Sequence, residues 1–217
     1  MIDNYSKLTL EKYIELQQMD WTSMEEIDIQ VNMIAILSDM SVDDILDLPL
    51  TEYKKMVQKI QFLLKQPNVK PRKVSKVVIN EKEYTVLDKV EDMTTGQYID
   101  YQTYLVQGED PKMIPYILSC VIVPKGKKYG EVDITEDLKQ LSVEEALTIS
   151  NFFMKQSRSL IKGTLLSLEW TMKKRAKKMK DEAMKEKMME AVKKIHLLRS
   201  SLKNGDGFQV LMQSLKQ

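Results

Sequence analysis

The sequence has 217 residues, of which 43% are hydrophobic and 30% charged, and its formal net charge at pH 7 is +1. This balance excludes a chain that is basic or acidic throughout, and the single cysteine, Cys120, excludes an intrachain disulfide. The longest apolar run, residues 113–123, is too short to cross a bilayer, and the first residues lack the pattern of a signal peptide. We therefore expect a cytosolic chain with no membrane partner.

Charge is distributed unevenly along the chain. Residues 1–66 carry 12 acidic and 6 basic side chains, whereas residues 151–203 carry 15 basic and 5 acidic ones. Two consequences stay open, namely attraction between the two ends of the chain and a partner that binds the basic region.

Residues 1–66 predict an N-terminal helical unit. Apolar residues recur there at helical spacing in four segments, each preceded by a polar residue suited to cap a helix. The expected helices cover residues 9–19, 25–38, 42–48 and 51–66, with Ser41 and Thr51 among the caps. Short polar turns between the segments favour a compact bundle.

Residues 67–92 predict a linker followed by a β-hairpin. Pro67 and Pro71 prevent the preceding helix from continuing. Residues 74–80 and 83–87 then alternate between apolar and polar side chains, with a polar segment between them. Because an isolated hairpin is only marginally stable, we expect it to lie on helices or to pair with another chain.

Residues 93–172 predict a second helical unit. Thr94 and Gln97 have the spacing of a capping box, and Asp133 can cap a short helix to Leu141. Residues 113–123 are expected to form a helix with Pro111 in its first turn, although a buried strand is the alternative. Residues 124–130 are expected to form a loop.

Residues 142–203 organise the second half of the chain. Ser142 and Glu145 form the next capping-box pattern, and a dense apolar stripe continues to Met172. Residues 173–203 contain neither glycine nor proline, and residues 173–217 are expected to form a basic helical arm and a last helix over residues 208–215. The predicted fold class is mainly α, with helical bundle units and one small β-hairpin.

The residues that carry chemistry are scattered. His196 is the only histidine and Cys120 the only cysteine, so neither a zinc site nor a nucleophile pair is indicated. We interpret His196 as an ordinary helix residue and Cys120 as a small buried hydrophobe. The loop 126–130 lacks the spacing of a phosphate-binding loop, and the acidic pairs lie at helix starts. We therefore expect a non-enzymatic protein without catalytic residues, metal ligands or a cofactor.

A basic cluster is the candidate site for binding a partner. It consists of Lys173, Lys174, Arg175, Lys177, Lys178 and Lys180. Such a cluster can contact nucleic-acid phosphates, but the mixed charges that follow it are typical of solvated or coiled-coil helices. No aromatic residues interleave with it, so a solvated or protein-contacting helix is favoured over nucleic-acid binding.

Residues 25–57, EEIDIQVNMIAILSDMSVDDILDLPLTEYKKMV, resemble the helical core of tail assembly chaperones of tailed phages. In those proteins an apolar helix leads into a Ser-x-Asp-Asp-Ile-Leu-x-Leu turn and then a docking helix. Residues 77–87 and the segment MTTGQYIDYQTY at 93–104 are similar to proteins of Bacteroides-type phages, including crAss-like phages. The resemblance covers about residues 8–172.

The resemblance implies a small helical protein of the host cytoplasm that binds other phage proteins during particle assembly. Its client would be the tape-measure protein, a long coiled chain that is kept soluble until the tail tube polymerises around it. This sequence departs from the simplest chaperones in its length and its basic arm. Two alternatives therefore stay open: a structural virion protein, such as a connector or internal cargo, and a nucleic-acid-binding accessory protein.

Overall fold

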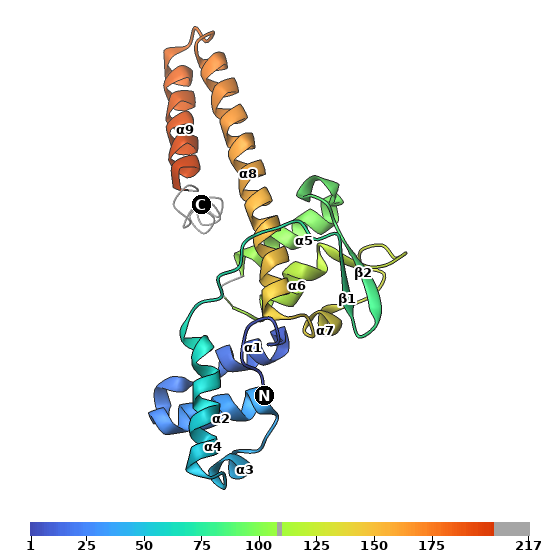
Figure 1. The fold of residues 1–217 in the computed structure, drawn as a ribbon. Helices are drawn as coiled ribbons and strands as arrows, with labels where there is room; N and C mark the ends of the chain where they lie inside the picture. The colour runs from blue at the N-terminus through green and yellow to red at the C-terminus, as the bar shows by residue number, and fades with distance from the viewer. Residues whose placement is uncertain (108–109, 202–217) are drawn as a thin grey trace. The chain divides into compact units, whose positions relative to one another are not determined.

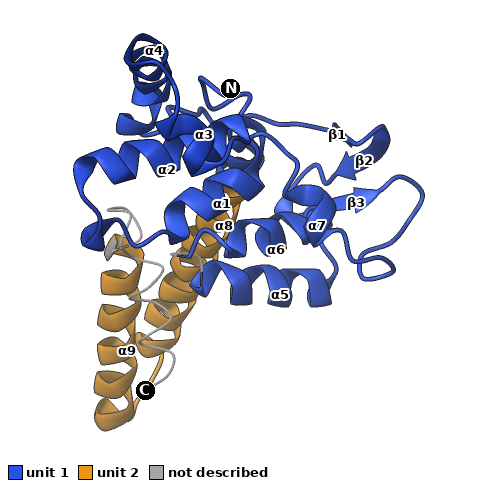
Figure 2. Cartoon of the chain, turned by 90° about the horizontal axis from the view of Figure 1, so that it is seen from below, with its two compact units in different colours: residues 1–152 blue, residues 153–217 orange. Residues whose placement is uncertain are grey.

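The computed structural model describes residues 1–107 and 110–201 (Figure 1). The chain divides into two compact units, residues 1–152 and residues 153–217, and their boundary falls inside one long helix (Figure 2). The described residues are mainly helical and contain one small antiparallel sheet. This confirms the predicted fold class.

Four helices occupy the first 60 residues, as predicted. They are α1 (Leu10–Gln18), α2 (Glu26–Ser38), α3 (Val42–Leu46) and α4 (Leu50–Ile60). The cap predicted at Thr51 is wrong, because α4 already begins at Leu50 after Pro49. Helix α4 is also shorter than predicted, because its end tightens into a 3-10 helix, Gln61–Leu64.

These helices bury one apolar cluster. Its buried members are Leu8, Leu16, Val31, Ile34, Leu37, Ile45, Ile60 and Val143. Val143 belongs to the cluster because two backbone hydrogen bonds join the regions around it: Val143 N donates to Leu8 O, and Leu10 N donates to Leu141 O, both at 2.8 Å. The start of the chain is thereby tied to the segment that leads into the longest helix.

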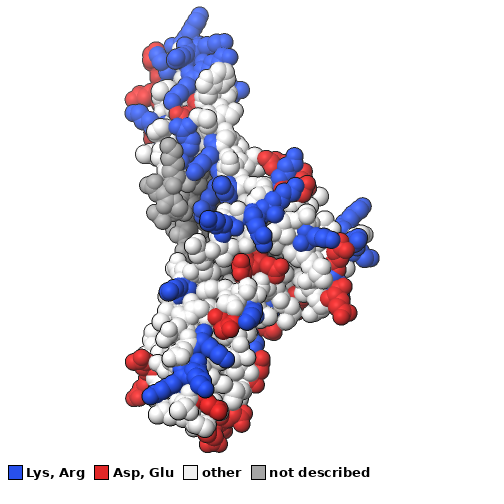
Figure 3. All heavy atoms as spheres, viewed as in Figure 1, with Lys and Arg blue, Asp and Glu red and all other residues white. Residues whose placement is uncertain are grey.

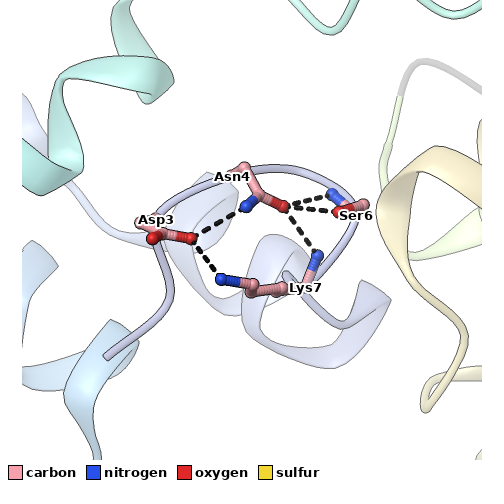
Figure 4. A network of polar contacts seen from close by, with 4 residues as sticks. All are labelled: Asp3, Asn4, Ser6 and Lys7. Atoms are coloured by element: carbon pink, nitrogen blue, oxygen red, sulfur yellow. Dashed lines mark hydrogen bonds and ion pairs between the residues drawn. The ribbon is translucent and has the colours of Figure 1, made fainter.

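An Asx turn at Asn4 precedes Leu8, which is buried (Figure 4). The Asn4 side-chain oxygen accepts hydrogen bonds from the Ser6 N–H at 3.1 Å and the Lys7 N–H at 3.2 Å. Asp3 completes the network, since its Oδ1 lies 2.8 Å from Asn4 Nδ2 and 2.9 Å from Lys7 Nζ. This local network turns the chain before α1 begins.

The sheet has three strands in the order β1-β2-β3, formed by β1 (Lys76–Ile79), β2 (Lys82–Val86) and β3 (Ile122–Pro124). The predicted hairpin is present as β1 and β2. The helix predicted over residues 113–123 is only partly correct, because α6 (Met113–Ser119) ends before β3 starts and Pro111 lies outside it. Residues 122–124 instead pair with β2, with Thr85 opposite the β-branched Val123, and so occupy the free edge of the hairpin.

The remaining helices are α5 (Thr95–Val106), α7 (Thr135–Leu138), α8 (Val143–Ala176) and α9 (Glu182–Ser201). Both halves of the predicted Thr94–Gln97 capping box are present. At the start of α8, Glu145 N donates to Ser142 Oγ at 3.2 Å, as predicted, and the Ser142 hydroxyl donates to the Glu145 carboxylate at 3.0 Å. The helix predicted over residues 208–215 lies outside the described residues. None of the helices described here combines the length and the apolar character that a bilayer-spanning segment requires.

Candidate functional site

The basic cluster lies at the turn of a helical hairpin formed by α8 and α9, which run side by side in both views (Figures 1 and 2). Buried and half-buried residues recur on both helices at alternating spacings of three and four, the pattern of a coiled-coil seam. On α8 they are Leu165, Glu169, Met172 and Ala176, and on α9 they are Lys185, Met188, Val192, Ile195 and Arg199.

Glu169 is the polar member of this seam. It is only 4% exposed, and its Oε1 accepts a hydrogen bond from Lys173 Nζ at 2.6 Å. Two side chains of α9 approach the same carboxylate: His196 Nδ1 lies 3.6 Å from Oε1, and the guanidinium Nη2 of Arg199 lies 3.5 Å from Oε2. A carboxylate withdrawn from water is thus surrounded by positive charge from both helices.

The hydrogen bond from Lys173 lowers the pKa of Glu169 below its ordinary value, and the charge of Arg199 acts in the same direction. Glu169 is therefore ionised at neutral pH, and its role here is to hold α9 against α8. His196 lies on a helix, as expected, but its contact with Glu169 was missed. No sequence signal identifies this contact, because the two residues belong to different helices.

The cations of the basic cluster divide into two groups. Lys173 is engaged with Glu169, and Lys174 Nζ lies 4.9 Å from the centre of the Trp170 ring, in a cation–π contact. The other four, which we call the basic turn, are exposed and form no ion pair with any described residue. They are Arg175, Lys177, Lys178 and Lys180. Figure 3 shows basic side chains gathered where α8 passes into α9.

The acids next to the basic turn are occupied by α9 itself. Asp181 Oδ1 accepts a hydrogen bond from Met184 N at 3.1 Å, and so caps the first turn of that helix. Glu182 lies 2.9 Å from Lys185 Nζ. Neither carboxylate is paired with a cation of the basic turn.

The hairpin also exposes apolar side chains outside its seam. Leu166 is 51% exposed and Trp170 is 63% exposed, and the two residues lie one helical turn apart on α8. Further exposed apolar residues of the hairpin are Leu168, Met184, Met189 and Leu197. Residues at such spacing form the kind of surface on which a partner helix packs.

Two side chains of the first unit that carry reactive groups, Tyr129 and Cys120, contact other side chains of that unit. Tyr129 donates a hydrogen bond to Asp100 at 2.8 Å, beside a cavity of about 250 Å³ that Tyr104 and Tyr116 also line. Burial raises the pKa of the Cys120 thiol to about 11. No group of three or more His, Cys, Asp or Glu side chains within the described ranges is arranged to hold a metal ion.

The fold and surface define the chain as a mainly helical protein with one small sheet and a basic helical hairpin. No family model matches this chain, and neither a curated protein nor a solved structure matches it.

Proposed function

We propose that this protein is a non-enzymatic phage assembly factor that binds a helical client of the tape-measure type, as a tail assembly chaperone does. The proposal combines the resemblance of residues 25–57 with the surface of the α8–α9 hairpin.

The exposure of Trp170 is the observation that carries the proposal. A tryptophan that is 63% exposed leaves a large apolar surface in water, and Leu166 extends that surface along the same helix. Tryptophan is also the residue type most enriched among those that dominate the energy of protein interfaces. An exposed tryptophan and leucine one turn apart therefore fit a client helix that lays its own apolar face against α8.

The methionines of α9 support the same function. Met184 is 58% exposed and Met189 is 38% exposed. Flexible thioether side chains adapt to different apolar partners, and this suits a client that presents many similar turns along a long helix.

Co-expression with the tape-measure protein of the same phage genome tests the proposal. The full chain should increase the soluble fraction of the tape-measure protein and co-purify with it. A variant with Leu166→Ser and Trp170→Ser should lose both effects while keeping its helix content in circular dichroism, because both side chains are more than half exposed.

The matched control removes two exposed apolar residues from the first unit instead. Leu64 is 84% exposed and Ile99 is 58% exposed, so Leu64→Ser with Ile99→Ser should leave client solubility unchanged. Equal loss in both variants would contradict a role for the hairpin. A chaperone should also be missing from purified particles, and stoichiometric presence there would favour the structural alternative.

A further inference from the structure

We propose that the basic turn binds the phosphodiester backbone of double-stranded nucleic acid. This function is separate from client binding, because it uses the cations at the end of the hairpin rather than the apolar side chains along α8. It also differs from the sequence-based interpretation, which favoured a solvated or protein-contacting helix for the same residues.

The segment around the basic turn carries an excess of positive charge. Residues 173–187 contain eight basic and three acidic side chains, a net charge of +5. Two of the three acids, Asp181 and Glu182, are engaged with Met184 N and Lys185 of α9. The positive charge of the basic turn is therefore not neutralised by its sequence neighbours.

The partial charges at the ends of α8 and α9 also act on the basic turn. Cations at the end of α8 are favourable, because the carboxyl end of a helix carries partial negative charge. Lys177 and Lys178 directly follow the carboxyl end of α8 at Ala176, whereas Lys180 lies two residues before α9, whose amino end carries partial positive charge. Lys180 thus lies near an end where an anion is electrostatically favourable, and Asp181 already caps that end.

The surroundings favour a duplex over two other polyanions. Single-stranded nucleic acid is bound largely through stacking on aromatic side chains, and residues 175–182 contain none; the nearest described one on α8, Trp170, is in contact with Lys174. An anionic membrane surface is bound most stably when apolar side chains insert beside the cations. Met179, the only large apolar residue in that segment, is half-buried. Exposed lysines and arginine alone match the regular phosphates of a duplex.

Fluorescence anisotropy with a labelled DNA duplex of about 30 base pairs tests the proposal, since salt dependence reports phosphate contacts. Four contacts predict that log K falls with log salt concentration at a slope of about −3.6, because each contact contributes about −0.9. The variant Arg175→Gln, Lys177→Gln, Lys178→Gln and Lys180→Gln should bind at least about tenfold more weakly in 50 mM salt and show a slope near zero.

The matched control removes the same number of exposed cations from the first unit. Lys54→Gln, Lys55→Gln, Lys59→Gln and Lys65→Gln change the net charge equally, and this variant should retain the affinity and slope of the wild-type protein. Equal weakening of both variants would overturn the proposal, since it would report net charge alone. Binding to vesicles with 30% phosphatidylserine but not to the duplex would also overturn it, as would the absence of duplex binding by the wild-type protein.

Discussion

The carboxylate of Glu169 on α8 lies 3.5 Å from the guanidinium of Arg199 on α9, and this pair joins the two helices of the hairpin. Glu169 occupies a seam position where an apolar residue is usual, and it is only 4% exposed. A buried charge is tolerated only where its partner can reach it. The pair therefore favours one register of α9 against α8 over registers shifted by a turn.

Replacing Glu169 should loosen the hairpin. In Glu169→Gln the cations of Lys173 and Arg199 lose the charge that they surround, so the amides of α9 should exchange with solvent several-fold faster in hydrogen-exchange measurements. Glu190→Gln is the matched control, because Glu190 pairs with Lys194 on the exposed surface of α9 at 3.5 Å. Equal acceleration in both variants would argue against a special role for the buried acid.

The hairpin should also be sensitive to acid. The pKa of Glu169 is lowered in the folded protein, chiefly by the hydrogen bond from Lys173, whereas its ordinary value is 4.5. Folding thus favours the ionised form of Glu169. The stability that this form contributes to the hairpin is complete above pH 4.5, and it is lost as the pH falls through the lowered pKa of the folded protein. Acid titration followed by exchange of α9 amides should show this loss in the wild-type protein and not in Glu169→Gln.

Tyr84 should make the first unit sensitive to alkali. Its side chain is 1% exposed and its hydroxyl donates to Asp137, and burial is the largest cause that raises its pKa from 10.0 to about 12. The unfolded chain releases the hydroxyl proton of Tyr84 more readily than the folded chain does. The stability that Tyr84 contributes is therefore complete below pH 10 and falls as the pH rises to 12. Denaturant titrations from pH 9 to pH 12 measure this fall.

Tyr84→Phe is the control for that titration. It should cost about 1 kcal/mol of unfolding free energy at neutral pH through the lost hydrogen bond. Its stability should then decline less than that of the wild-type protein above pH 10. A parallel decline in the two proteins would show that other groups control the alkaline transition.

Glu81→Gly should stabilise the β-hairpin. Asn80 and Glu81 form the two-residue turn between β1 and β2, with φ values of 48° and 66°. Positive φ at both positions is the requirement of a type I′ turn, which glycine meets at its second position without steric strain. The unfolding free energy should rise by about 1 kcal/mol. Lys76→Gly, in a strand, should instead lower it by about 0.5–1 kcal/mol.

Cys120 should be unreactive in the folded protein. Its side chain is 0% exposed, and burial raises the pKa of the thiol to about 11, so little thiolate forms at pH 8. A disulfide reagent should modify it only in denaturant. A Lys112→Cys variant, with its second thiol at an exposed position, should react with one equivalent when folded and two when unfolded. Rapid reaction of the wild-type protein would contradict the buried position.

The local features were predictable because their partners lie within a few residues. The capping boxes at Ser41 and Thr94 each join residues three positions apart, so sequence spacing alone identifies them. The buried state of Cys120 also follows from its apolar neighbours. Periodicity similarly located α1, α2 and the β1–β2 hairpin to within a few residues.

The sequence by itself determined most of the helical segments, the caps at Ser41, Thr94 and Ser142, and where positive charge accumulates. Only the tertiary structure decided that residues 122–124 become a strand, that α9 returns along α8, and that Glu169 is buried beside Arg199. The physical reason is distance along the chain. A short apolar run forms a strand when an unpaired edge such as that of β2 is available, and an acid is buried when another helix supplies its cation. Neither condition is encoded within the neighbouring residues.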